Sequence, residues 1–253
     1  MDPELKKKRL KYFLKSFETF LYKWMLKTCE GFIVLSEDSE KWLERYNKKV
    51  FVIPGMVSSI EAGRAITENL NIEKRNYILY SGSLEERYGL KDLLDAFILA
   101  DIESFDLIIC GEGSYREEVE NKSMAYNSIK YLGSLPRVEV IELQRNATLL
   151  VNPRSTSGDF TRFSFPSKTM EYFLSGSPVL MRPLPGIFPE FEDFVFLDYE
   201  QTVESLASSM KYILALPAEE IKIKTRKAIE YIAQTRTESV QTAAFCKHLQ
   251  LQS

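Results

Sequence analysis

Residues 162–180 have the sequence Arg-Phe-Ser-Phe-Pro-Ser-Lys-Thr-Met-Glu-Tyr-Phe-Leu-Ser-Gly-Ser-Pro-Val-Leu. Pro166 suits the first turn of a helix, where a missing N–H costs no hydrogen bond. Gly176 is typical of a residue that ends a helix, and the apolar residues from Pro178 onward begin a buried strand. The stretch therefore predicts a helix that leads directly into a strand, which is a repeating unit of α/β folds.

The start of this predicted helix has the properties of a phosphate site. A helix N-terminus offers free N–H groups and a partial positive charge, and Lys168 adds a formal charge there. Glu171 lies three residues on, on the same helix face, and could accept hydrogen bonds from sugar hydroxyls. Together these groups favour a nucleotide or a nucleotide-sugar. An ordinary helix capped by Ser164 or Phe165, with a Lys–Glu surface pair, would carry the same residues.

Apolar, strand-like runs alternate with helix-like segments through the rest of the chain. The runs lie at residues 77–80, 107–110, 129–132, 149–151, 178–180 and 194–197. This alternation predicts an α/β fold built on a doubly wound parallel sheet, and such sheets bind ligands at the carboxyl ends of their strands. The turns that follow the runs are therefore the expected position of the site.

Two of these turns carry residues suited to a phosphate. Gly82, in Ser81-Gly82-Ser83, would let the backbone approach a ligand closely, although a plain strand-to-helix turn would also need it. Arg154 follows the run at 149–151 and suits a phosphate or a sugar hydroxyl. A salt bridge from Arg154 to Asp159 or Glu171 is the alternative.

The stretch at 162–180 resembles the nucleotide-binding signature of family-4 retaining glycosyltransferases with the GT-B fold. It is most similar to the bacterial capsule and exopolysaccharide branch, which carries Ser-Phe-Pro-Ser-Lys-x-x-Glu-Tyr followed by Gly-x-Pro-Val. The resemblance implies transfer of a sugar from a nucleotide-sugar donor, with a UDP-sugar favoured, to a glycan or lipid-linked acceptor with retention. It implies no metal and no other cofactor.

The resemblance also assigns roles to individual residues. The implied catalytic residues are Arg87, Lys168 and Glu171. The implied substrate-binding residues are Gly82, Ser83, Arg154, Ser164, Phe165, Pro166 and Ser167.

The chain departs from the wider family pattern at several positions. Ser83 stands where many relatives carry a phosphate-binding arginine, and Tyr88 stands where they carry a lysine, so that Arg87 could supply the missing charge. The family's earlier glutamate, eight positions before the one that matches Glu171, is replaced by Phe163. Asp159 or Arg162 could then contact the transferred sugar in its place.

The first 56 residues have a different pattern. Residues 5–27 form a basic helical segment with an apolar stripe, and the runs at 32–35 and 50–53 predict two strands, too few for an independent sheet. The resemblance implies that residues 1–56 are a remnant of an acceptor-side domain and that 57–253 form the nucleotide-sugar-binding domain with C-terminal helices. The basic helix could bind a separate acceptor-domain subunit, a second copy or a membrane surface, or it could cover an absent domain.

Composition excludes several other classes. The chain has 33 Lys and Arg against 36 Asp and Glu, a net charge of -3, so no nucleic-acid partner is expected. Its three cysteines lack metal-ligand spacing, and no apolar run is long enough to span a membrane, so we expect a cytoplasmic protein that could sit at the inner face of the membrane. Two alternatives stay open: a non-catalytic nucleotide-sugar-binding subunit that needs a partner, and a flavodoxin-like nucleotide binder of another class. The sequence lacks the glycine motifs of ATPases and dehydrogenases, which argues against those versions of the second alternative.

Overall fold

A computed structural model describes residues 3–53, 55–68, 72–154, 156, 161–163, 168–184 and 191–251, with side chains described between Tyr12 and Leu249. Its centre is a six-stranded sheet in which every pair of neighbouring strands is parallel, in the order β5-β4-β3-β6-β7-β8. The strands are β3 (Arg75–Ser81), β4 (Asp106–Cys110), β5 (Ile129–Tyr131), β6 (Ala147–Asn152), β7 (Val179–Met181) and β8 (Phe196–Leu197). The predicted α/β fold with a parallel sheet is therefore confirmed.

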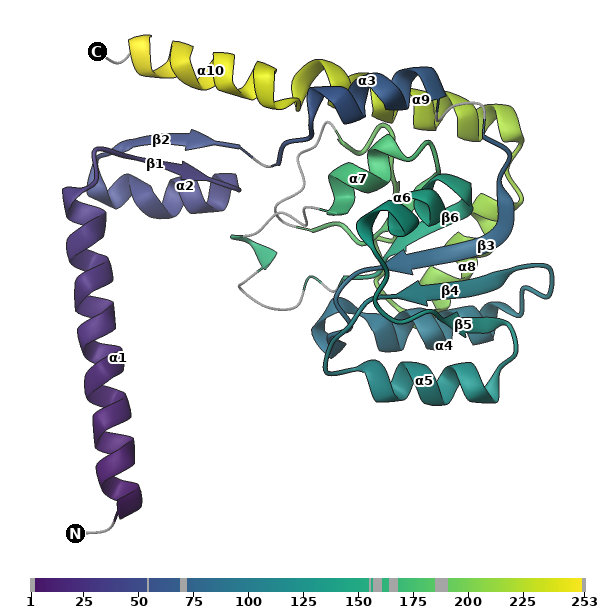
Figure 1. The fold of residues 1–253 in the computed structure, drawn as a ribbon, viewed down its shortest axis with the longest axis horizontal. Helices are drawn as coiled ribbons and strands as arrows, with labels where there is room; N and C mark the ends of the chain where they lie inside the picture. Colours follow the sequence, from purple (N-terminus) through teal and green to yellow (C-terminus); the bar gives the residue numbers. More distant parts are fainter. Residues whose placement is uncertain are drawn as a thin grey trace.

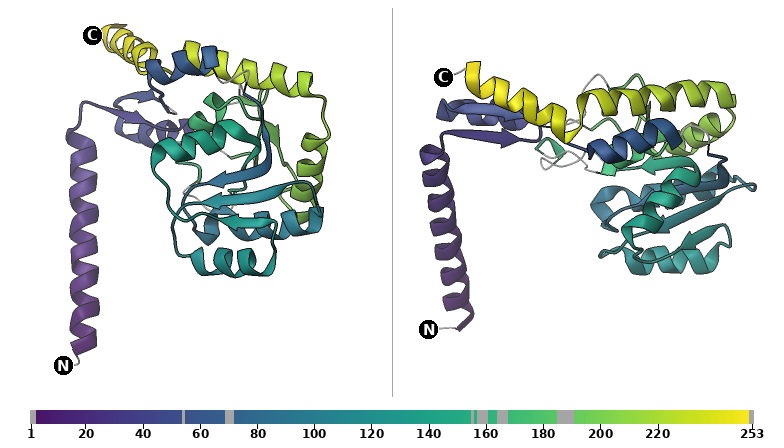
Figure 2. Two further views of the ribbon diagram at one scale, coloured as in Figure 1. Left: turned by 45° about the vertical axis from the view of Figure 1, so that its right-hand side comes forward. Right: turned by 45° about the horizontal axis from the view of Figure 1, so that its top comes forward.

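Helices cover both faces of this sheet (Figures 1 and 2). Side chains of α4 (Leu90–Ala100), α5 (Arg116–Ala125) and α8 (Val203–Leu214) share one buried cluster with the first face. The second face is covered by α3 (Ser59–Glu68), α6 (Arg137–Asn146), α7 (Lys168–Leu174) and α9 (Ala218–Thr235). Because both faces are buried, the strands are continuous apolar runs, with Leu79 of β3 paired to Ile108 on one side and Leu150 on the other.

The chain winds outward from β3 in both directions. From β3 it proceeds to β4 and β5 on one side, and after α6 it returns to β6 on the other side of β3. The strand order thus reverses between β3 and β6. Ligands of open α/β sheets bind in the crevice at such a reversal, outside the carboxyl ends of the strands.

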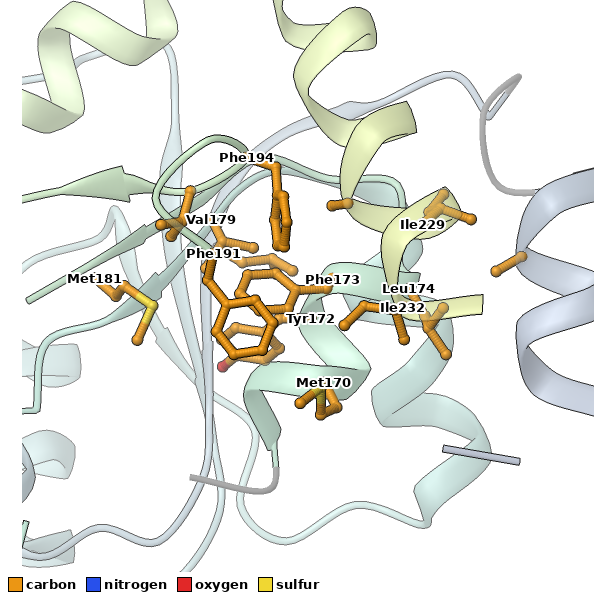
Figure 3. Close-up of a cluster of buried hydrophobic side chains, with 14 of the residues drawn as sticks. Met170, Tyr172, Phe173, Leu174, Val179, Met181, Phe191, Phe194, Ile229 and Ile232 are labelled. Atoms are coloured by element: carbon orange, nitrogen blue, oxygen red, sulfur yellow. The ribbon is translucent and has the colours of Figure 1, made fainter. Parts of the chain in front are cut away.

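An aromatic cluster holds α7 against the second face (Figure 3). The ring of Phe173 lies 5.5 Å from that of Phe191 and 5.2 Å from that of Phe194, measured between centroids. Tyr231 of α9 packs on Phe191 at 5.7 Å. A helix of seven residues is too short to be stable alone, so this packing determines where α7 lies.

The N-terminal part forms a second, smaller sheet. Its strands β1 (Gly31–Val34) and β2 (Lys49–Val52) are parallel and are joined by α2 (Glu37–Leu43) and the 3₁₀ helix η1 (Glu44–Tyr46). The C-terminal helix α10 (Glu238–Leu251) lies beside this sheet, with the rings of Phe51 and Phe245 5.4 Å apart. The division of the chain at residue 56 stays a prediction.

The first helix, α1 (Pro3–Thr28), extends away from the rest of the molecule (Figure 1). Phe13, Phe17, Phe20 and Trp24 are each more than half exposed, and their three- and four-residue spacing places them on one face of the helix. No described helix combines the length and apolar character needed to cross a membrane.

Candidate functional site

The turns after β3 and β4 pack directly on each other. The Gly82 N–H donates to the Cys110 carbonyl at 3.0 Å. A Cβ atom on Gly111, whose φ is +143°, would lie 1.7 Å from the Gly82 carbonyl oxygen, and one on Gly113 would lie 2.2 Å from that of Leu84. The two glycines of the turn Gly111-Glu112-Gly113 are therefore required by contact between the turns.

Gly82 itself is packed against a neighbouring tyrosine. A Cβ at Gly82 would lie 2.9 Å from the hydroxyl of Tyr80, which donates to the Ser83 carbonyl at 2.8 Å. The absence of a side chain at Gly82 thus makes room for Tyr80, in agreement with the plain-turn alternative. Its close approach to a ligand stays a prediction, as does the role of Ser83, an exposed residue of the same turn.

Arg87 and Arg154 meet on the ring of Tyr88. Tyr88 ends the 3₁₀ helix η3 (Glu86–Tyr88), and the guanidinium carbons of Arg87 and Arg154 lie 5.1 and 5.2 Å from its ring centroid. Both distances are typical of cation–π contacts. Burial, helped by the charge of Arg87, lowers the pKa of Arg154, while Tyr88 and Tyr80 oppose that shift. Two cations predicted from separate turns are therefore in one cluster, and Tyr88 is the residue that joins them.

The cluster depends on a close contact of the main chain. Gly89 has a φ of +78°, and a Cβ there would lie 2.1 Å from the Pro153 carbonyl oxygen. Pro153 directly precedes Arg154, and Gly89 directly follows Tyr88. The absence of a side chain at Gly89 thus lets the turn after β3 meet the turn after β6.

Tyr172 fixes α7 to the end of β3. Its hydroxyl accepts a hydrogen bond from the Ser81 N–H at 2.9 Å, and Gln144 donates to the Ser81 hydroxyl at 3.0 Å. Burial raises the pKa of Tyr172 to about 12, so the group stays a neutral hydroxyl. The second half of α7 is in this way held beside the end of β3, directly before Gly82.

Lys168, the first residue of α7, is exposed, and its charge influences the Cys110 thiol at the end of β4. Burial raises the pKa of the Cys110 thiol to about 11, and the charge of Lys168 opposes that increase. Because α7 lies between the parallel strands β6 and β7, it begins on the carboxyl-edge side of the sheet, and Lys168 begins there with it.

Glu171 faces a different group. Its Oε1 lies 3.3 Å from Nη2 of Arg137, which also pairs with Glu61 at 2.8 Å. Among the described residues Glu171 pairs with neither Lys168 nor Arg154, so the Lys168–Glu171 and Arg154–Glu171 ion pairs are not formed. The alternative salt bridge from Arg154 to Asp159 stays a prediction, because Asp159 lies outside the described residues. Arg137 could not be predicted as the partner of Glu171, because it precedes Glu171 by 34 residues and only the folded chain brings the two to the same cavity.

A cavity of about 330 Å³ lies beside this ion pair. It is bounded by α3, α6 and α7, and its charged and polar lining consists of Glu61, Arg64, Glu68, Arg137, Gln144, Arg145, Glu171 and Ser175. Its volume is at the small end of the range for ligand pockets. Glu171 lines this cavity, whereas Arg87, Arg154 and Lys168 lie outside its lining.

Other predicted residues have different positions. Arg162 pairs with Asp38 of α2 at 2.8 Å, so its guanidinium joins the turn at 161–163 to the N-terminal sheet. Ser164, Phe165, Pro166, Ser167 and Asp159 lie outside the described residues, and α7 is described from Lys168 onward. Within the described part of the chain, no group of three or more His, Cys, Asp or Glu side chains could hold a metal ion.

A family model described as glycosyl transferases group 1 matches residues 64–236, which is more than half of the chain. The chain belongs to the group 1 glycosyl transferases. A search of curated proteins found no match.

The chain is similar in fold to several solved structures. Sucrose-phosphate synthase from Thermosynechococcus elongatus matches 92% of this chain and 61% of its own, with a TM-score of 0.67 and 20% identity. A UDP-forming trehalose-phosphate synthase from Burkholderia xenovorans matches 90% and 63%, with a TM-score of 0.71 and 12% identity. TarM from S. aureus matches 90% and 46%, with a TM-score of 0.70 and 14% identity. The chain thus spans less than two thirds of each of these solved chains.

The contact at Gly89 leads to a stability prediction. Gly89→Ala should lower the free energy of unfolding by about 2 kcal/mol or more, because the new methyl meets the Pro153 carbonyl in a left-handed backbone conformation. Gly63→Ala is the matched control: nothing lies within 4 Å of its Cβ position in α3, so it should raise that free energy by up to about 1 kcal/mol. Urea unfolding measures both, and equal midpoints for the two variants would show that Gly89 tolerates a side chain.

Proposed function

We propose that this chain is the donor-binding part of a family-4, capsule-type glycosyltransferase that transfers a sugar from a UDP-sugar to a glycan or lipid-linked acceptor with retention. The observation that carries this proposal is the arrangement of three cations at the carboxyl edge of the sheet. Arg87 and Arg154 share the Tyr88 ring, and Lys168 begins α7 on the same edge. This is the position at which doubly wound sheets bind nucleotides.

The three cations suit the departure of a nucleoside diphosphate. Negative charge grows on the leaving phosphate as the sugar departs, and preorganised positive groups stabilise that charge. Arg87, Arg154 and Lys168 supply it here. Since these groups perform the neutralisation, we propose that the reaction uses neither a metal ion nor another cofactor.

Glu171 suits the hydroxyl groups of the ligand. Its carboxylate is partly exposed at the edge of the cavity and is oriented by Arg137, so one oxygen is held by an ion pair while the other can accept hydrogen bonds. We propose that the ribose binds at this carboxylate and that the diphosphate extends toward Lys168. The named relatives are consistent with a uridine nucleotide, since one is UDP-forming and TarM was solved in complex with UDP.

A second candidate function is a nucleotide-sugar-binding subunit that transfers nothing alone. The observation that favours it is the N-terminal part, where β1 and β2 pair only with each other among the described strands and α1 exposes its apolar stripe. A parallel sheet is normally larger and covered on both faces. A separate acceptor-domain subunit would complete it, and one solved structure of similar fold is a complex of two proteins, GtfA/B.

The proposed donor site predicts different losses of binding affinity for UDP and for pyrophosphate. Lys168→Ala should weaken binding of both UDP and free pyrophosphate about 10-fold or more, the scale of a charge-assisted hydrogen bond. Glu171→Gln should weaken UDP more than pyrophosphate, because only UDP has hydroxyls to donate. Isothermal titration calorimetry measures both affinities, with Lys211→Ala and Glu204→Gln on α8 as controls of the same chemistry.

Equal losses for both ligands in both variants would contradict separate phosphate and ribose sites. Wild-type protein that binds no nucleoside diphosphate at millimolar concentration would refute the proposed function altogether.

The stripe on α1 predicts association. We expect the protein to self-associate or to bind anionic vesicles, because Phe13, Phe17, Phe20 and Trp24 form an exposed apolar surface on a helix that also carries lysines. Replacing these four residues with serine should abolish both behaviours, whereas Tyr12→Ser with Tyr22→Ser, on another face of the helix, should not. Sedimentation with and without vesicles measures the outcome, and a wild-type monomer that ignores vesicles would contradict the expectation.

A further inference from the structure

The structure contains one almost fully buried arginine near the candidate site. Arg182 directly follows β7, and only 1% of its surface is exposed. Its Nη1 donates to Oδ2 of Asp92 at 2.7 Å and to the Pro153 carbonyl at 3.3 Å. Its Nη2 donates to the Gln201 carbonyl at 3.0 Å. One side chain thus joins α4, the turn after β6 and the loop before α8.

The charge of Arg182 is balanced inside the protein. Its Nε lies 3.6 Å from Oδ2 of Asp198, which is only 2% exposed, and Asp92 is its second carboxylate partner. Asp198 is itself held by the Ser205 hydroxyl at 2.5 Å and the Gln201 N–H at 3.3 Å. A guanidinium that is buried and paired in this way is not exposed to a ligand. Such pairs rarely add stability over apolar residues of the same volume, so a role in fixing geometry is the better account.

The geometry that Arg182 fixes is that of the cation cluster. The Pro153 carbonyl to which it donates is the one that Gly89 approaches, and Pro153 directly precedes Arg154. Asp92 lies in the first turn of α4, which starts immediately after Gly89 and Tyr88. Arg182 therefore holds both main-chain segments whose side chains meet as Arg154 on Tyr88.

We propose that Arg182 is a positioning residue for the diphosphate site: without contacting the ligand, it sets the distance between Arg154 and the Arg87–Tyr88 pair. This inference rests on the proposed function in one respect, the assignment of those cations to the diphosphate. It adds a residue to which the sequence motifs gave no role.

The test combines a ligand measurement with one that needs no ligand. In Arg182→Lys the positive charge remains, but the planar guanidinium group that donates to Asp92, Pro153 and Gln201 at the same time is lost. Pyrophosphate and UDP should each bind about 10-fold more weakly, while uridine, which has no phosphate, should bind unchanged. In the free protein, nuclear Overhauser contacts between the Arg154 side chain and the Tyr88 ring should weaken or disappear.

A matched control and a milder variant separate positioning from folding. Arg45→Lys, in η1 of the N-terminal part, loses the hydrogen bond from its Nε to the Trp42 carbonyl at 2.7 Å, and it should leave pyrophosphate affinity unchanged. Asp92→Asn, at a partly exposed carboxylate, should weaken pyrophosphate about 3-fold even if Arg182→Lys fails to fold.

The outcomes distinguish this inference from the proposed function. Intact Arg154–Tyr88 contacts in Arg182→Lys, or unchanged pyrophosphate affinity in both Arg182→Lys and Asp92→Asn, would overturn the positioning role while the donor site stands. Equal losses for uridine and pyrophosphate would also overturn it, since they indicate general unfolding. A wild-type protein that does not bind pyrophosphate would overturn the phosphate site and this inference with it.

Discussion

The close approach of Gly89 to the Pro153 carbonyl is the contact on which the candidate site depends. It brings together two turns that follow neighbouring strands, β3 and β6, at the point where the strand order of the sheet reverses. A larger residue at Gly89 would separate these turns, and the guanidinium groups of Arg87 and Arg154 could not share one tyrosine ring. Backbone packing at a single glycine thus determines whether the positive charges of Arg87 and Arg154 lie together or apart.

Lys168 and Glu171 are both positioned by the packing of α7 on the second face of the sheet. Tyr172 and the aromatic cluster around Phe173 fix α7, so Lys168 lies toward the strand ends while Glu171 is oriented by Arg137 at the cavity. One short helix therefore presents a positive group and a carboxylate in two directions. A ligand with a diphosphate at one end and hydroxyls at the other matches that arrangement, which is why we favour a nucleotide-sugar.

The sequence predicted the sheet and the residue types of the site but not the contacts among them. Strands such as 77–80 and 107–110 were predictable because burial on both faces requires continuous apolar runs. Tyr88 as a platform for two arginines and Arg137 as the partner of Glu171 were not predicted. Both contacts join residues far apart in the chain, and nothing local signals them. Arg182 likewise gave no signal, since an arginine after a strand is usually exposed.

The glycine-rich turns show a second limit of sequence reasoning. A Gly-x-Gly after a strand can serve a ligand or a neighbouring turn, and at Gly111 and Gly113 the neighbouring turn already occupies the space that a side chain would need. Only the packed structure distinguishes the two. The resemblance at 162–180 indicated the correct broad family, which the family match then established.

Hydrogen exchange of backbone amides, followed by mass spectrometry with and without saturating UDP, tests the central claim most directly. If the carboxyl edge of the six-stranded sheet is the nucleotide site, UDP should slow exchange in the segments 81–89, 111–114, 131–133, 152–154 and 168–172. A second groove, lined by residues of β1, β2 and α10 that include Phe51, Phe245 and His248, should be unaffected. Protection confined to that groove, or no protection at saturation, would contradict the account.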